Sequence, residues 1–134
     1  MPLLDISQLV EDALLHSGCD KGMIAPLDSH STIALDFHWS PTIYVSRREV
    51  DIWLWCRLTE YHESNFNFYA ADLLKEQMKK QAFLRSDHLN LNENEGHLEL
   101  SGLIHASYLE NGVEFAKALE GFLERADVFR DIVK

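Results

Sequence analysis

The chain has 134 residues, of which 46% are hydrophobic and 25% are charged, a composition typical of one globular domain and not of a disordered chain. Acidic residues outnumber basic ones by 22 to 12, which gives a formal net charge of −10 and opposes binding to nucleic acid or to an anionic membrane. No apolar stretch is long enough to span a bilayer, and the first residues lack the pattern of a signal peptide.

The first third of the chain predicts a helix followed by a loop. An amphipathic helix is expected over residues 5–17, with Asp5 and Gln8 spaced as in a capping box and Gly18 at its end. Its apolar stripe has helical spacing and consists of Ile6, Leu9, Val10, Ala13 and Leu14. Residues 19–31 are rich in turn formers and are predicted to form a loop.

Three strands are expected next, over residues 32–37, 42–46 and 50–58, in an antiparallel meander because their connections are short. In the third strand, Trp53 and Trp55 point to the face opposite the aliphatic residues. A sheet with one wet face should not carry two tryptophans on it. Three interpretations stay open: helices cover both faces, the tryptophans pack inside the monomer, or this face meets another chain.

The second half predicts a helix over residues 65–83, capped by Ser64, with an apolar surface wide enough to be covered on two sides. A short strand at 89–91, a turn at 92–96 and a strand over 97–105 follow. The last helix is expected over 112–133, and its apolar side consists of Phe115, Leu119, Phe122, Ala126, Phe129 and Val133. The order α-β-β-β-α-β-β-α predicts one α+β domain over residues 1–134, a twisted antiparallel sheet packed by helices.

Motifs for catalysis or cofactor binding are absent from the sequence. It contains no GxxxxGK phosphate loop, no HExxH and no paired Cys/His spacing. The group His88, His97 and His105 is a candidate metal site across the last two strands, but scattered surface histidines are the preferred interpretation. We therefore predict no enzyme activity, no cofactor and no metal.

Two short arrangements of nucleophile-like residues have structural interpretations as well. The run 28–30 (Asp-Ser-His) contains the three residue types of a catalytic triad, but consecutive residues cannot adopt the triad geometry, so a polar loop is predicted. Cys19 lies near His16 without a third orienting residue, and we interpret it as a structural thiol. With Cys56 as the only other cysteine and no CxxC pair, a reducing cytosol is expected.

Four stretches together resemble the class I type III secretion chaperones, and within them the class IB subgroup of invasion protein B (InvB)-like, SpaK-like proteins. They are DISQLVEDALLHSGCDKGMI, LDSHSTIALD, VDIWLWCRL and NGVEFAKALEGF. The similarity spans essentially the whole chain. Its motifs describe a fold and a surface, not a catalytic site.

The resemblance implies a homodimer in the bacterial cytoplasm that binds the N-terminal segments of one or several secreted effectors and keeps them export-competent. The secretion ATPase is a further partner that it implies. The implied dimer interface lies on helix 65–83 and consists of Phe66, Ala70, Leu73, Leu74 and Met78. The implied effector-binding positions lie on the sheet and are Leu35, Phe37, Ile43, Val45, Trp53 and Trp55. The pair Arg47-Arg48 departs from the family pattern and adds positive charge before the third strand.

Two other functions stay open at this point. One is a regulatory adaptor that binds a folded partner. The other is a small ligand-binding α+β domain, whose pocket would be lined by Trp53, Trp55 and nearby histidines.

Overall fold

The computed structural model describes residues 5–17, 24–28, 32–37 and 41–134, and the backbone alone for 24–28. The elements run in the order α1 (Ile6–His16), β1 (Ile24–Asp28), β2 (Thr32–Leu35), β3 (Ile43–Arg48), β4 (Asp51–Glu60), α2 (Glu63–Gln77), β5 (Asn90–Asn94), β6 (His97–Leu103), a 3-10 turn η2 (Ala106–Leu109) and α3 (Gly112–Ile132). The predicted α+β class is confirmed, with an antiparallel sheet packed by helices.

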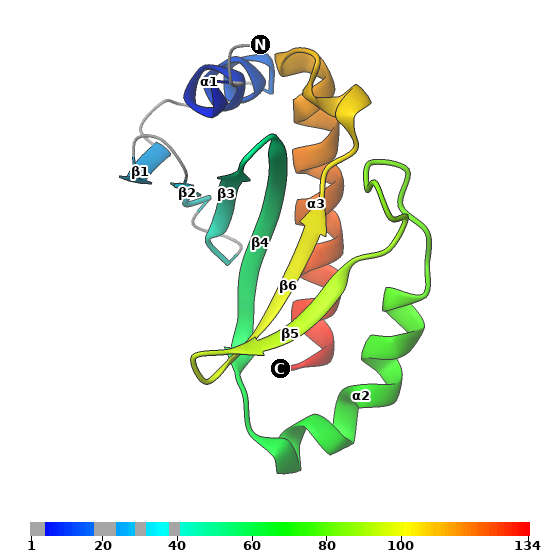
Figure 1. The fold of residues 1–134 in the computed structure, drawn as a ribbon. Coiled ribbons are helices and arrows are strands. Elements are labelled where there is room, and N and C mark those ends of the chain that lie inside the picture. Colours follow the sequence, from blue (N-terminus) through cyan, green and yellow to red (C-terminus); the bar gives the residue numbers. More distant parts are fainter. Residues whose placement is uncertain (1–4, 18–23, 29–31, 38–40) are drawn as a thin grey trace.

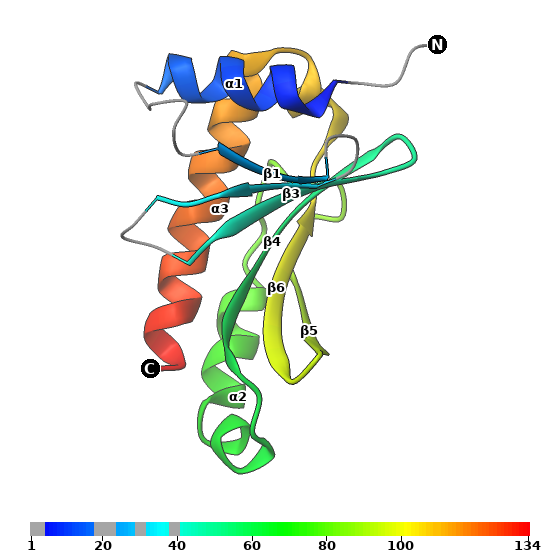
Figure 2. The same ribbon diagram turned by 90° about the vertical axis from the view of Figure 1, so that its left-hand side faces the viewer.

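In the described part of the chain, the sheet has six strands in the order β1-β2-β3-β4-β6-β5, and every neighbouring pair is antiparallel. α2 connects β4 to the edge strand β5, and β6 then returns to pair with β4. In Figures 1 and 2, α3 runs along one side of the sheet, and α2 lies on the same side as α3. α1 crosses the N-terminal end of α3. The helices therefore cover one face, which we call the inner face; the other is the outer face.

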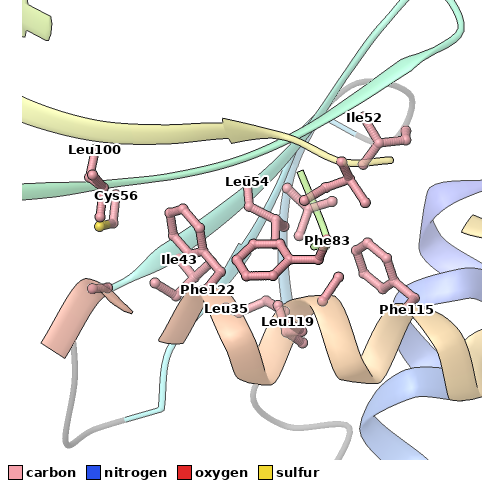
Figure 3. Close-up of a cluster of buried hydrophobic side chains, with 14 of the residues drawn as sticks. Leu35, Ile43, Ile52, Leu54, Cys56, Phe83, Leu100, Phe115, Leu119 and Phe122 are labelled. Atoms are coloured by element: carbon pink, nitrogen blue, oxygen red, sulfur yellow. The ribbon is translucent and has the colours of Figure 1, made fainter. Parts of the chain in front are cut away.

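The core lies between the inner face and α3. Alternation along β4 buries Ile52, Leu54, Cys56 and Leu58, and β4 meets Phe115, Leu119 and Phe122 of α3 (Figure 3). The predicted stripe on α3 is confirmed, except that Val133 follows the helix and is only partly buried. Half of the predicted capping box of α1 is confirmed, because the Asp5 carboxylate accepts a hydrogen bond from the Gln8 backbone N–H at 3.2 Å. The Gln8 side chain does not complete the box, since its amide donates to the Asp12 carboxylate at 2.8 Å.

Several boundary predictions were wrong. The expected turn 92–96 is largely the end of β5, which continues to Asn94, and the strand expected over 97–105 ends at Leu103. Part of the expected loop 19–31 is the edge strand β1, which pairs with β2. Pro26 was interpreted as a turn former, but an edge strand can accommodate proline, because the missing backbone N–H is not needed on the unpaired side. The expected helix 65–83 begins earlier, after His62, and ends at Gln77. The chain leaves the helix there, and Phe83 and Leu84 are buried in the core; a Cβ on Gly121 of α3 would lie 2.7 Å from the Phe83 ring.

Within the described residues, the helices are too short or too polar to cross a membrane.

Candidate protein-binding surfaces

The six positions predicted to bind an effector fall on two different faces of the sheet. Leu35, Ile43 and Val45 have no exposed surface, and Phe37 is 2% exposed, so all four belong to the core of this chain. The reason is register: Ile43 pairs with Leu35, and Val45 pairs with Leu54, so they share the inner face that α3 covers. Trp53 and Trp55 lie on the outer face and are partly exposed.

An ordered aromatic cluster occupies the middle of the outer face. The rings of Tyr44 and Trp55 stack across β3 and β4, with centroids 4.1 Å apart and planes 17° apart. The Trp55 indole N–H donates to the Ser46 hydroxyl at 2.9 Å, and the Arg48 guanidinium lies 5.8 Å from the centre of the Trp53 ring. These contacts hold the rings in place while leaving part of their surface to solvent.

Beside the aromatic cluster, the outer face is hollowed into a trough of about 190 Å³, which we call the outer trough. Its aromatic wall is formed by Trp53 and Trp55 on β4, and its amide wall consists of the side chains of Asn90, Asn92 and Asn94 on β5. Ser101 of β6 pairs with both Trp55 and Asn90, so a small side chain lies between the two walls. The remaining lining residues are Arg48 and Glu99.

Ion pairs occupy most of the charged groups around this face. Glu99 is bound by Arg57 at 3.4 Å, and Arg57 also contacts Glu95 at 3.2 Å. At the other end of β4, Arg85 binds Asp51 at 2.7 Å. Each of these three carboxylates therefore has an arginine partner within the chain, and Arg57 is shared by two of them.

α2 buries far less of its apolar surface than the other two helices. Leu73 is its one fully buried side chain, and Phe66 and Tyr69 pack partly against the core. Leu73, a predicted interface residue, therefore belongs to the inside of the monomer, while Phe66 and Ala70 are partly buried.

The opposite side of α2 is an exposed apolar stripe. Phe68 is 87% exposed, Leu74 54% and Met78, just after the helix, 66%. Three exposed residues share one side of the helix at i, i+3 and i+7 spacing: Ala71, Leu74 and Met78. Phe68 lies one turn earlier on the same side. We call Phe68, Ala71, Leu74 and Met78 the α2 stripe. Side chains of this size on solvent mark an interaction surface more often than chance.

α2 is fastened to α3 by a charged cluster. The Glu76 carboxylate accepts from Arg125 at 2.7 Å and pairs with Lys79 at 2.8 Å. The Arg125 guanidinium also lies 5.6 Å from the centre of the Phe129 ring. The hydrogen bonds from Lys79 and Arg125 hold the pKa of Glu76 below its ordinary value.

The structure does not bring together the three histidines of the candidate metal site. His88, His97 and His105 each bond locally, to the Gln77 carbonyl, the Glu95 carbonyl and the Ser107 hydroxyl respectively. In the described part of the chain, no three His, Cys, Asp or Glu side chains are placed to hold a metal ion.

The candidate nucleophiles offer no assembled site either. Burial, with Glu99 and Asp127 adding to it, raises the pKa of the Cys56 thiol to about 12, so this thiol is inert. Cys19, Ser29 and His30 lie outside the described residues.

Sequence reasoning missed several residues of these surfaces. Phe68 was counted among the apolar residues of the second helix but not assigned to an interface, and the helical spacing of the α2 stripe was the available signal. Asn90 was assigned to the short strand 89–91, and Asn92 was assigned to the turn 92–96. Their spacing of two was a signal for a shared strand face, but which face stays open cannot be predicted locally.

Two comparisons with known proteins agree on a family. Residues 18–95, from the end of α1 through β5, match the invasion protein B family. The surface presentation of antigens protein SpaK of Salmonella typhimurium strain LT2 is 39% identical over 129 residues, which cover 96% of each chain. The protein of the same name from Salmonella typhi has the same identity and coverage.

Proposed function

The chain belongs to the invasion protein B family, which is associated with type III secretion, and on this basis we propose that it is a chaperone for the N-terminal segments of secreted effectors. It binds them in the bacterial cytoplasm and keeps them soluble and unfolded until export. It works as a homodimer and as a binding protein, without turnover of any substrate.

The observation that carries this proposal is the α2 stripe. Phe68, Leu74 and Met78 expose large apolar side chains on a helix that the same chain covers on the opposite side only. Burial of such side chains in a protein–protein contact is favourable by about 25 cal/mol per Å² of apolar surface. A second copy supplies the same stripe, so a two-fold interface is self-complementary. The proposed interface is therefore the α2 stripe with the partly buried Phe66 and Ala70, and without Leu73.

The sheet supports the client-binding part of the proposal. Its outer face carries fixed, partly exposed aromatic rings at Tyr44, Trp53 and Trp55. Within the described residues, both sheet edges, β1 and β5, have no further strand paired to them. Extended peptides bind to such edges by backbone pairing and to such faces by side-chain packing. Two copies would double the surface available, which offsets the entropy that an unfolded client loses on binding.

The dimer is tested by light scattering after size-exclusion chromatography. The substitution Phe68→Asp places a carboxylate in the α2 stripe, and we expect it to convert a dimer into monomers without unfolding the chain. Val113→Asp, which charges an exposed apolar residue at the start of α3, is the matched control and should stay dimeric. An unchanged dimer in Phe68→Asp, or a monomeric unsubstituted chain, contradicts the interface.

The client is tested by co-expression with the N-terminal segments of effectors encoded near the gene. We expect at least one segment to co-purify with the chain and to remain accessible to protease except where it is bound. If no segment co-purifies, the chaperone function is rejected, and binding to a folded partner becomes the better explanation.

A further inference from the structure

We propose that the outer trough binds an extended, uncharged stretch of a client, with its backbone hydrogen-bonded to Asn90 and Asn92 and its apolar side chains against Trp53 and Trp55. This inference rests on the proposed function, because it assigns a chemical class to the client at one defined place. The face involved is open: α2 and α3 lie on the other side of the sheet, and α1 crosses above its upper end (Figure 2).

The geometry of the amide wall selects an extended client. Asn90 and Asn92 pair in register with Ser101 and Glu99 and lie on the same face of β5. Residues two apart on a strand repeat after about 6.8 Å, and a bound peptide in the β conformation repeats its own backbone groups on one side with the same period. A polyproline helix repeats after three residues of about 3.1 Å, or about 9.3 Å, and does not match.

The hydrogen-bonding chemistry of the amide wall fits a peptide backbone. Each asparagine side chain offers both a donor and an acceptor, as a peptide group does. Asn94 donates to the Glu99 carboxylate at 3.4 Å. Within the residues that the structure describes, the side chains of Asn90 and Asn92 make no hydrogen bond. Two adjacent positions of the amide wall are thus available to a peptide lying along β6.

The aromatic wall and the charges define the client side chains. The Trp55 N–H is already bonded to Ser46, so this ring offers its apolar surface. Glu99, next to the middle of the trough, is paired with Arg57, and the Arg48 guanidinium lies against the Trp53 ring. Both charged groups that line the trough therefore already have a partner within the chain. A stretch that alternates apolar and small polar residues places its apolar side chains on one side, against the tryptophans.

The test is a titration of the 15N-labelled full-length chain with a capped hexapeptide that alternates valine and serine. We expect the side-chain amide signals of Asn90 and Asn92 and the indole signal of Trp53 to shift together. The double substitution Asn90→Ala, Asn92→Ala should raise the dissociation constant about tenfold, since two hydrogen bonds are lost. Glu93→Ala changes the same strand on its other face and should stay within about twofold.

Several outcomes would overturn the inference. The trough is not a site for extended peptides if the double variant binds like the unsubstituted chain. The same conclusion follows if hexaproline or methyl glucoside perturbs the same residues at lower concentration than the alternating peptide. A client that co-purifies equally with the double variant rejects the trough and leaves the chaperone function standing. If the peptide titration shows binding in the trough but no effector segment co-purifies with the chain, the trough is supported and the chaperone function is rejected.

Discussion

Trp55 illustrates how a single side chain on the outer face is fixed before any partner arrives. The ring stacks on Tyr44 at 4.1 Å, and its N–H is bonded to Ser46. Ser46 is itself 7% exposed and lies 3.2 Å from the Thr32 hydroxyl. A ring held in this way loses little rotational freedom on binding, so more of its contact energy contributes to affinity.

The Glu76 carboxylate makes the attachment of α2 dependent on pH. Hydrogen bonds from Lys79 and Arg125 lower its pKa in the folded chain, so the folded state favours the ionised form. The resulting stabilisation is fully present above the unfolded glutamate pKa of about 4.3. It is lost as the pH falls through the lowered folded value.

We therefore predict that Glu76→Gln lowers the free energy of unfolding at pH 7 and that the difference from the unsubstituted chain shrinks as the medium is acidified below about pH 4. Urea unfolding at a series of pH values measures it. Glu110→Gln alters an exposed carboxylate near η2 and is the control, expected to change little at any pH. A constant difference for Glu76→Gln across this range would contradict the assignment.

Among the elements, α1 packs closely against the first residue of α3. A Cβ on Gly112 would collide with the Cβ of Asp12 and lie 2.8 Å from the Asp12 backbone carbonyl carbon. The two helices approach this closely because the first residue of α3 has no side chain. The Ser17 hydroxyl donates to Glu120 at 3.3 Å and joins the two helices farther along.

The substitution Gly112→Ala should therefore displace α1 and cost about 1–3 kcal/mol in the free energy of unfolding, because backbone atoms cannot move aside cheaply. Urea unfolding gives the free energy, and hydrogen exchange should show faster exchange of the α1 amides. Gly102→Ala is the matched comparison, since its new methyl group meets the flexible end of the Leu84 side chain and should cost less. Equal costs would contradict the backbone explanation.

At the scale of the whole molecule, the proposed dimer makes folding stability depend on concentration. Association stabilises only the folded form, so a hundredfold increase in protein concentration should raise the melting temperature by about 5 °C. Differential scanning calorimetry at several concentrations measures this. In Phe68→Asp, the melting temperature should be independent of concentration. The same independence in the unsubstituted chain would exclude a dimer coupled to folding.

Much of the fold could be predicted from local patterns, because helix and strand periodicities are local properties. The spacing on α1 and α3 placed their core sides, and the alternation on β4 separated Ile52 and Leu54 from Trp53 and Trp55. Strand β1 was missed because proline and turn formers obscure an edge strand. α2 was drawn too long because apolar composition continues past Gln77, while the core takes Phe83 and Leu84 in a non-helical segment.

The candidate surfaces were harder to predict, because the face of a sheet that helices cover is decided by contacts far apart in the sequence. Leu35, Phe37, Ile43 and Val45 have the apolar character of a groove, yet α3 and the inner face enclose them. Leu73 and Leu74 are neighbours on α2, and only their angular positions on the helix separate a core residue from an exposed one. Helical periodicity predicts which of the two is buried only after one buried position on the helix is known.

The open outer face also gives the protein a spectroscopic property. The chain has three tryptophans, and two of them, Trp53 and Trp55, line the same trough. Replacing Trp39, which lies outside the described residues, with phenylalanine would leave all indole emission originating beside that hollow. A ligand that binds in the trough changes the polarity around both indole rings. Its binding can therefore be followed as a shift of the tryptophan emission maximum in unlabelled protein.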